Sequence, residues 1–140
     1  MGGINTGRVI LGGLLAGLVF NIGETILNMF VLAAPMQEAM QAHNLAQPGG
    51  GAMGVFVLLG FLIGIVLVWL YAAVRPRLGP GPKTAGIVGV AAWFFIYPGA
   101  VVAMVSMGLL PANLAALALV WGLVELVLAA LAGGWLYKEA

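Results

Sequence analysis

The stretch that decides the fold is Gly13–Asn28, GLLAGLVFNIGETILN, where a carboxylate lies in the middle of an otherwise apolar segment. At about 100° per helical residue, the small and polar side chains share one stripe roughly 80° wide. The members of this stripe are Gly13, Gly17, Asn21, Glu24 and Asn28. An ionisable side chain at membrane depth is costly unless it is neutralised or partnered. The stretch therefore predicts a membrane-spanning helix with a candidate functional site at Glu24.

Composition supports the same class for the whole chain. Of 140 residues, 64% are apolar and only 6% are charged, which lies far outside the range of soluble domains. Four apolar stretches, at 9–34, 52–74, 84–110 and 112–137, each reach the roughly 20 residues that cross a bilayer. We predict an all-α, polytopic membrane protein, with residues 1–140 forming one bundle of four transmembrane helices with short loops. The absence of cysteine excludes disulfides and thiolate metal sites.

The positive charges predict the orientation. If the four helices alternate in direction, one side of the membrane receives every Lys and Arg of the chain, namely Arg8, Arg75, Arg77, Lys83 and Lys138. The positive-inside rule makes that side cytoplasmic, so both termini are expected in the cytoplasm. The repeats Trp69-Leu70-Tyr71 and Trp135-Leu136-Tyr137 end two helices on this side, where we expect their rings at the lipid headgroups.

The connection from Arg75 to Lys83 holds three prolines and three cations. It predicts a stiff, basic loop in which Arg75, Arg77 and Lys83 contact anionic headgroups. Docking of a protein partner is the alternative role for this loop.

A short helix is predicted on the opposite side. Proline disfavours helical geometry in the residue before it, so Pro35 is expected to end or kink the first helix. After it, Met36, Ala39, Met40 and His43 recur at helical spacing, opposite a polar face. This pattern is typical of a short amphipathic helix lying on the outer membrane surface.

Two glycine pairs indicate where helices pack. Gly13 and Gly17 in the first helix, and Gly60 and Gly64 in the second, have the spacing that lets helix backbones approach closely. Such pairs predict packing without identifying the partner helix.

Three polar side chains from three helices lie at one depth. At about 1.5 Å per residue, Glu24 lies roughly 15 Å from the outer end of its helix, and Tyr97 and Glu125 each lie roughly 18 Å deep. Asn21 and Asn28 flank that level on the face of Glu24. No cation lies within the four apolar stretches, so the two glutamates are expected to hold one or two protons at neutral pH. These five residues are the candidate proton or cation site.

We interpret this site as evidence for proton- or cation-linked transport or conductance. The alternative is a non-catalytic membrane subunit or scaffold whose buried glutamates only join helices, since hydrogen bonds between membrane helices average about 0.6 kcal/mol. No nucleophile, metal-ligand set or phosphate loop accompanies the carboxylates, so no enzyme activity and no cofactor are predicted.

Methionines suggest a minor alternative, which is Cu(I) handling. All methionines except the first lie toward the outer end, and thioether and imidazole ligands suit this ion. The candidate ligands are Met36, Met40, His43, Met104 and Met107. Methionine is also an ordinary filler of irregular apolar gaps.

The segments NIGETILN, VRPRLGPGPKT and WGLVELVLAALAGGWLY together resemble small bacterial four-helix membrane proteins with no assigned activity. The resemblance implies a bacterial inner-membrane location and transfers no functional residues. The expected partners are the lipid bilayer and either further copies of the chain or a larger membrane complex, because four helices enclose little aqueous volume. No nucleic acid is expected to bind.

Overall fold

A computed structural model describes residues 3–139, and all regular structure in that range is helical. The elements in chain order are α1 (Thr6–Ile26), the π-helical turn η1 (Leu27–Val31), α2 (Ala33–Ala42), α3 (Gly50–Leu78), α4 (Pro82–Ser106) and α5 (Ala112–Leu136). Four spans of 25 to 29 residues, the first formed by α1 and η1 together, are long and apolar enough to cross a membrane. The predicted all-α membrane bundle, with a short helix after the first span, is confirmed.

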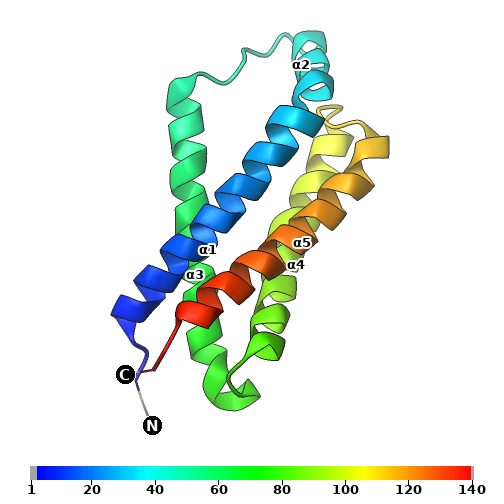
Figure 1. Cartoon of the computed structure of the whole chain (residues 1–140). Helices are drawn as coiled ribbons and strands as arrows, with labels where there is room; N and C mark the ends of the chain where they lie inside the picture. Colours follow the sequence, from blue (N-terminus) through cyan, green and yellow to red (C-terminus); the bar gives the residue numbers. More distant parts are fainter. Residues whose placement is uncertain (1–2, 140) are drawn as a thin grey trace.

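The four long helices alternate in direction (Figure 1). Helix α1 packs against α3 and α5, and α4 packs against α5. Both chain ends and the α3–α4 turn lie at one end of the bundle, which we call the terminal end. Helix α2 and the α4–α5 connection lie at the other end, the α2 end. The cationic residues of the chain therefore gather at the terminal end, as the alternating order requires.

Three helix ends differ clearly from the expected ones. The first span ends at Leu32 rather than at Pro35. Pro35 is instead the third residue of α2. Proline is tolerated there because the first N–H groups of a helix have no partner within the helix. Helix α3 continues past Val74 to Leu78, where Gly79 ends it at a φ of 85°. Similarly, α4 ends at Ser106 before the left-handed Gly108.

The glycine pairs of the first two spans lie against each other. A Cβ on Gly17 would lie 2.7 Å from Cα of Phe61, and one on Gly64 would lie 2.6 Å from Cα of Gly17. A Cβ on Gly13 would likewise lie 2.5 Å from Cα of Ile65. Such distances leave no room for a side chain, so α1 and α3 meet backbone to backbone around Gly13, Gly17, Gly60 and Gly64.

Replacing Gly64 by alanine is expected to destabilise the bundle by about 1–3 kcal/mol, because the added methyl group forces α1 and α3 apart. Gly54→Ala is the matched control in the same helix, since nothing lies within 4 Å of a Cβ added there. Equilibrium unfolding in detergent, followed by circular dichroism, measures both changes. Equal stability of the two variants would contradict the close helix contact.

The aromatic residues at the terminal end divide into two groups. Trp69 and Trp135 are 50% and 78% exposed and can face lipid headgroups, as expected. Tyr71 and Tyr137 are each only 4% exposed, so the expectation that they face the headgroups is wrong. Their hydroxyls accept hydrogen bonds from backbone N–H groups, Tyr71 from Gly81 at 3.0 Å and Tyr137 from Asn5 at 3.3 Å. The phenol groups thereby fasten the α3–α4 turn and the chain start to the bundle.

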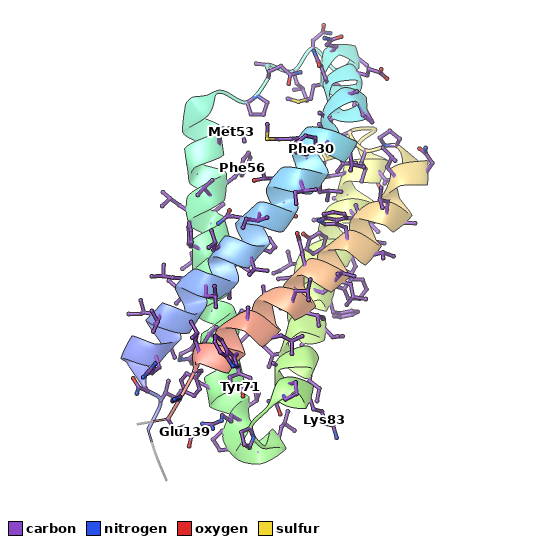
Figure 2. All side chains as sticks on the ribbon, in the orientation of Figure 1. Phe30, Met53, Phe56, Tyr71, Lys83 and Glu139 are labelled. Carbon is purple, nitrogen blue, oxygen red and sulfur yellow. The ribbon has the colours of Figure 1, made fainter. Side chains whose placement is uncertain are left out.

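The three cations of the α3–α4 region also differ in environment. Arg75 lies in the last turn of α3 and pairs with Glu139, with 3.0 Å between Nη1 and Oε1. Arg77 and Lys83 are exposed, and Figure 2 shows Lys83 pointing away from the bundle while Glu139 and Tyr71 lie near its end. Arg77 and Lys83 are therefore free to meet lipid headgroups, whereas Arg75 is engaged within the chain.

Candidate functional site

The structure brings Glu24, Tyr97 and Glu125 into direct contact. The Tyr97 hydroxyl on α4 lies 2.5 Å from Oε1 of Glu24 on α1, and it also contacts Oε1 of Glu125 on α5. Three helices that are distant in sequence thus meet through one phenol group. We call these three side chains the carboxyl–tyrosine cluster.

Two glycines create the space for this cluster. A Cβ on Gly122 of α5 would lie 2.5 Å from Cδ1 of Tyr97, so the tyrosine ring lies directly against the α5 backbone. A Cβ on Gly23 of α1 would lie 3.2 Å from the Glu125 Cβ and would collide with the Glu125 carboxyl group. Neither glycine was singled out from the sequence, although each lies within three residues of a glutamate of the cluster.

Two tryptophans hold the surrounding helices in register. Trp121 Nε1 donates to the Gly23 carbonyl at 3.1 Å, which joins α5 to α1 directly beside the cluster. Trp93 Nε1 donates to the Leu119 carbonyl at 2.8 Å, which joins α4 to α5. Because buried indole N–H groups need acceptors, these bonds also fix the depth at which the helices pack.

The two carboxyl groups have different surroundings. Glu125 is 5% exposed, and its Oε2 has no hydrogen-bond partner in the described part of the chain. Glu24 is half-buried, and its Oε2 accepts a hydrogen bond from Asn28 Nδ2 at 2.9 Å. Glu125 is therefore sealed inside the bundle, whereas Glu24 lies at its edge.

The hydrogen bonds of Tyr97 fix a minimum number of protons. A phenol hydroxyl carries one proton, so it can donate to one carboxylate only. Contact with two carboxyl oxygens therefore requires a second proton, and that proton must be on Glu24 or Glu125. Glu24 also accepts a hydrogen bond from Asn28, whereas the sealed Glu125 has no donor besides the phenol, so burial disfavours the charged form of Glu125. The arrangement thus favours a protonated Glu125 that donates to Tyr97, while the Tyr97 hydroxyl donates to Glu24.

A π-helical turn positions Asn28. The α-helical hydrogen-bond pattern ends at Ile26, and Leu32 N–H bonds to the Leu27 carbonyl five residues back, at 2.9 Å. Within this wider turn, Asn28 Nδ2 donates both to the Glu24 carbonyl, at 2.8 Å, and to its carboxylate. Single π turns inside helices occur frequently at functional sites.

Asn21 makes its hydrogen bonds to backbone carbonyls. Its Nδ2 donates to the Gly17 carbonyl at 2.9 Å and to the Val57 carbonyl of α3 at 3.2 Å. The side chain ties α1 to α3, and no hydrogen bond joins it to either carboxyl group among the described residues.

A groove leads from the α2 end to Glu24. Toward the α2 end α3 diverges from α1, and the connection from α2 to α3 passes over the space between them (Figure 1). This α1–α3 groove has a volume of about 640 Å³. Its polar lining consists of Asn21, Glu24, Thr25, Asn28, Gln37 and Gln47. Four methionines line it as well, Met29, Met36, Met40 and Met53, and Figure 2 shows Met53 and Phe56 on the side of α3 that faces α1.

The structure divides the candidate copper ligands between two places. Met36 and Met40 line the groove, whereas His43 lies against Gly108, since a Cβ there would be 3.0 Å from its Nε2. Met104 and Met107 belong to the end of α4 and the turn after it, beside Gly108. Among residues 3–139, no group of three or more His, Cys, Asp or Glu side chains could hold a metal ion.

No protein-family model, no curated protein and no solved structure matches this chain.

Proposed function

We propose that this chain is a small proton-linked cation transport or conductance protein. One observation carries the proposal: the Tyr97 hydroxyl bridges two carboxyl groups, one sealed in the bundle and one at the groove. Such a cluster can exchange a proton, and its Glu24 carboxyl group lines a groove that is open to a cation.

The route of the proton follows from the order of the contacts. When Glu125 gives its proton to the Tyr97 oxygen and Tyr97 gives its own to Glu24, the proton vacancy moves from Glu24 to Glu125. No heavy atom needs to move far, because each acceptor already touches its donor. A cation that binds beside ionised Glu24 and a proton that binds to the same carboxylate therefore compete, which links the two movements.

The groove crosses only part of the bundle. At its lower end Gly60 lines the groove, and there α1 and α3 come into backbone contact. Passage to the terminal end requires these two helices to separate or a second chain to complete the path. We propose a homo-oligomer or a larger membrane complex for this reason.

The membrane placement is part of the proposal. The cations at the terminal end support a cytoplasmic location for both termini, by the positive-inside rule. In a bacterial inner membrane the α2 end and the mouth of the groove would then face outward.

The second candidate is a non-catalytic subunit or scaffold in which the cluster only joins helices. The hydrogen bonds from Trp93 and Trp121 favour it, because they show that polar contacts elsewhere in the bundle do serve packing. This candidate predicts that removing the titratable group from Glu24 leaves function unchanged.

Flux in proteoliposomes separates the two candidates. With a pH gradient across the membrane, we expect liposomes that contain the wild-type protein to transport protons faster than protein-free liposomes. We expect the Glu24→Gln variant to show only the protein-free rate. Gln retains the volume and hydrogen-bonding capacity of Glu but cannot release a proton. Glu38→Gln is the matched control, because Glu38 is exposed on α2 and does not line the groove. Equal flux through wild type and Glu24→Gln would refute proton handling at Glu24 and favour the scaffold.

A further inference from the structure

We propose that the α1–α3 groove binds a monovalent organic cation with an apolar body, whose charge lies beside Glu24. The inference rests on the proposed function and names the class of cation that would be transported. Three features of the groove lead to it, namely its size, its charge and the chemistry of its walls.

The size of the groove favours a molecule over a bare ion. Sites for drug-sized ligands measure about 300–1,000 Å³, and the volume of about 640 Å³ lies within this range. A metal cation would need several oxygen ligands converging on one point. Among the described residues that line the groove, Glu24 supplies the only carboxylate, which is few charged oxygen ligands for a metal ion.

The charge of the groove favours a cation. Glu24 is the one carboxylate among the described residues that line the groove, and it accepts hydrogen bonds at both oxygens, from Tyr97 and from Asn28. Among the described residues that line the groove, none is basic. An ionised carboxylate in an apolar surrounding without a counter-charge is costly, and a bound cation removes that cost.

The walls suit an apolar body. Met29, Met36, Met40 and Met53 supply flexible, polarisable thioethers, which adapt to ligands of different shape. Phe20 and Phe56 add aromatic rings, whose faces attract organic cations. The amides of Gln37 and Gln47, near α2, leave the opposite end of the groove polar.

Tetraphenylphosphonium is the probe for this site, because it is a permanent organic cation that cannot itself carry a proton. Calorimetric titration of tetraphenylphosphonium into the purified wild-type protein in detergent is expected to show one saturable site per chain. Glu24→Gln is expected to weaken binding by roughly thirtyfold or more, the usual effect of removing one member of a desolvated charge pair. Glu38→Gln is expected to bind as the wild type does.

Two further comparisons keep the result interpretable. Tetraphenylborate has the same shape and the opposite charge, so it should not compete. Met53→Ala should weaken binding, whereas Met104→Ala, which changes the same residue type outside the groove, should not. Circular dichroism and size-exclusion chromatography of each variant verify that its fold is retained.

The outcomes distinguish the groove assignment from the proposed function. Absent binding, binding unaffected by Glu24→Gln, or equal competition by tetraphenylborate would each overturn the assignment. A lipid retained equally by wild type and Glu24→Gln, with no phosphonium bound, would assign the groove to an acyl chain instead. Glu24-dependent proton flux without phosphonium binding would support the proposed function and reject the organic-cation site. Glu24-dependent binding without any flux would leave the groove as a binding site and remove transport.

Discussion

Tyr97→Phe is expected to reduce proton-linked flux to the rate of protein-free liposomes and to lower the stability of the bundle. The change removes the hydroxyl oxygen that contacts both carboxyl groups. Proton transfer between Glu24 and Glu125 then has no bridging oxygen. The carboxyl group of Glu125, already buried, also loses its hydrogen-bond partner, which costs about 1–3 kcal/mol. Flux in proteoliposomes and unfolding in detergent measure the two effects separately.

Tyr71→Phe is the matched control for this experiment. Tyr71 is buried, as Tyr97 is. Its hydroxyl accepts a hydrogen bond from the Gly81 N–H at the terminal end of the bundle, away from the groove. Its loss is expected to cost about 1 kcal/mol of stability and to leave flux unchanged. If Tyr97→Phe and Tyr71→Phe transported equally, the bridging role of Tyr97 would be wrong.

The meeting of Glu24, Tyr97 and Glu125 could be anticipated because helices are regular. In a bundle of helices that cross the same thickness, position along the chain converts directly to depth. Equal depth alone does not bring side chains together, since each must also face the interior. Glu24 and Glu125 satisfy that condition because ionisable groups avoid lipid, and Tyr97 satisfies it because its hydroxyl needs a partner.

Other parts of the site could not be predicted from depth and periodicity. The role of Gly23 and Gly122 depends on which side chain from a neighbouring helix approaches them, which is a property of the packed bundle. Asn21 shares the helix face of Glu24, but the approach of α3 gives it a nearer partner in the Val57 carbonyl. The π turn at Leu27–Val31, which contains Asn28, leaves no mark in the hydrophobic pattern.

The α1–α3 groove could not be predicted from the sequence either. The glycine pairs predict close packing, but they do not predict that α3 diverges from α1 between Gly60 and the α2 end. The region of α3 from Gly54 to Leu59 is exposed, and nothing lies within 4 Å of a Cβ added at Gly54. Met36 and Met40, which suggested a metal site from their position near one end of the bundle, line this groove next to a carboxylate.

The central claim is that the carboxyl–tyrosine cluster holds a proton at neutral pH and that Glu125 carries it. Infrared spectroscopy tests this directly, because the C=O stretch of a protonated carboxylic acid is separate from the bands of carboxylates. The chain has only four acidic side chains, and Glu38 and Glu139 are exposed at the ends of the bundle. At pH 7 the account predicts one protonated carboxyl per chain, present in wild type and in Glu24→Gln and absent in Glu125→Gln. A wild-type spectrum without this band, or a band that persists in Glu125→Gln, would contradict the account.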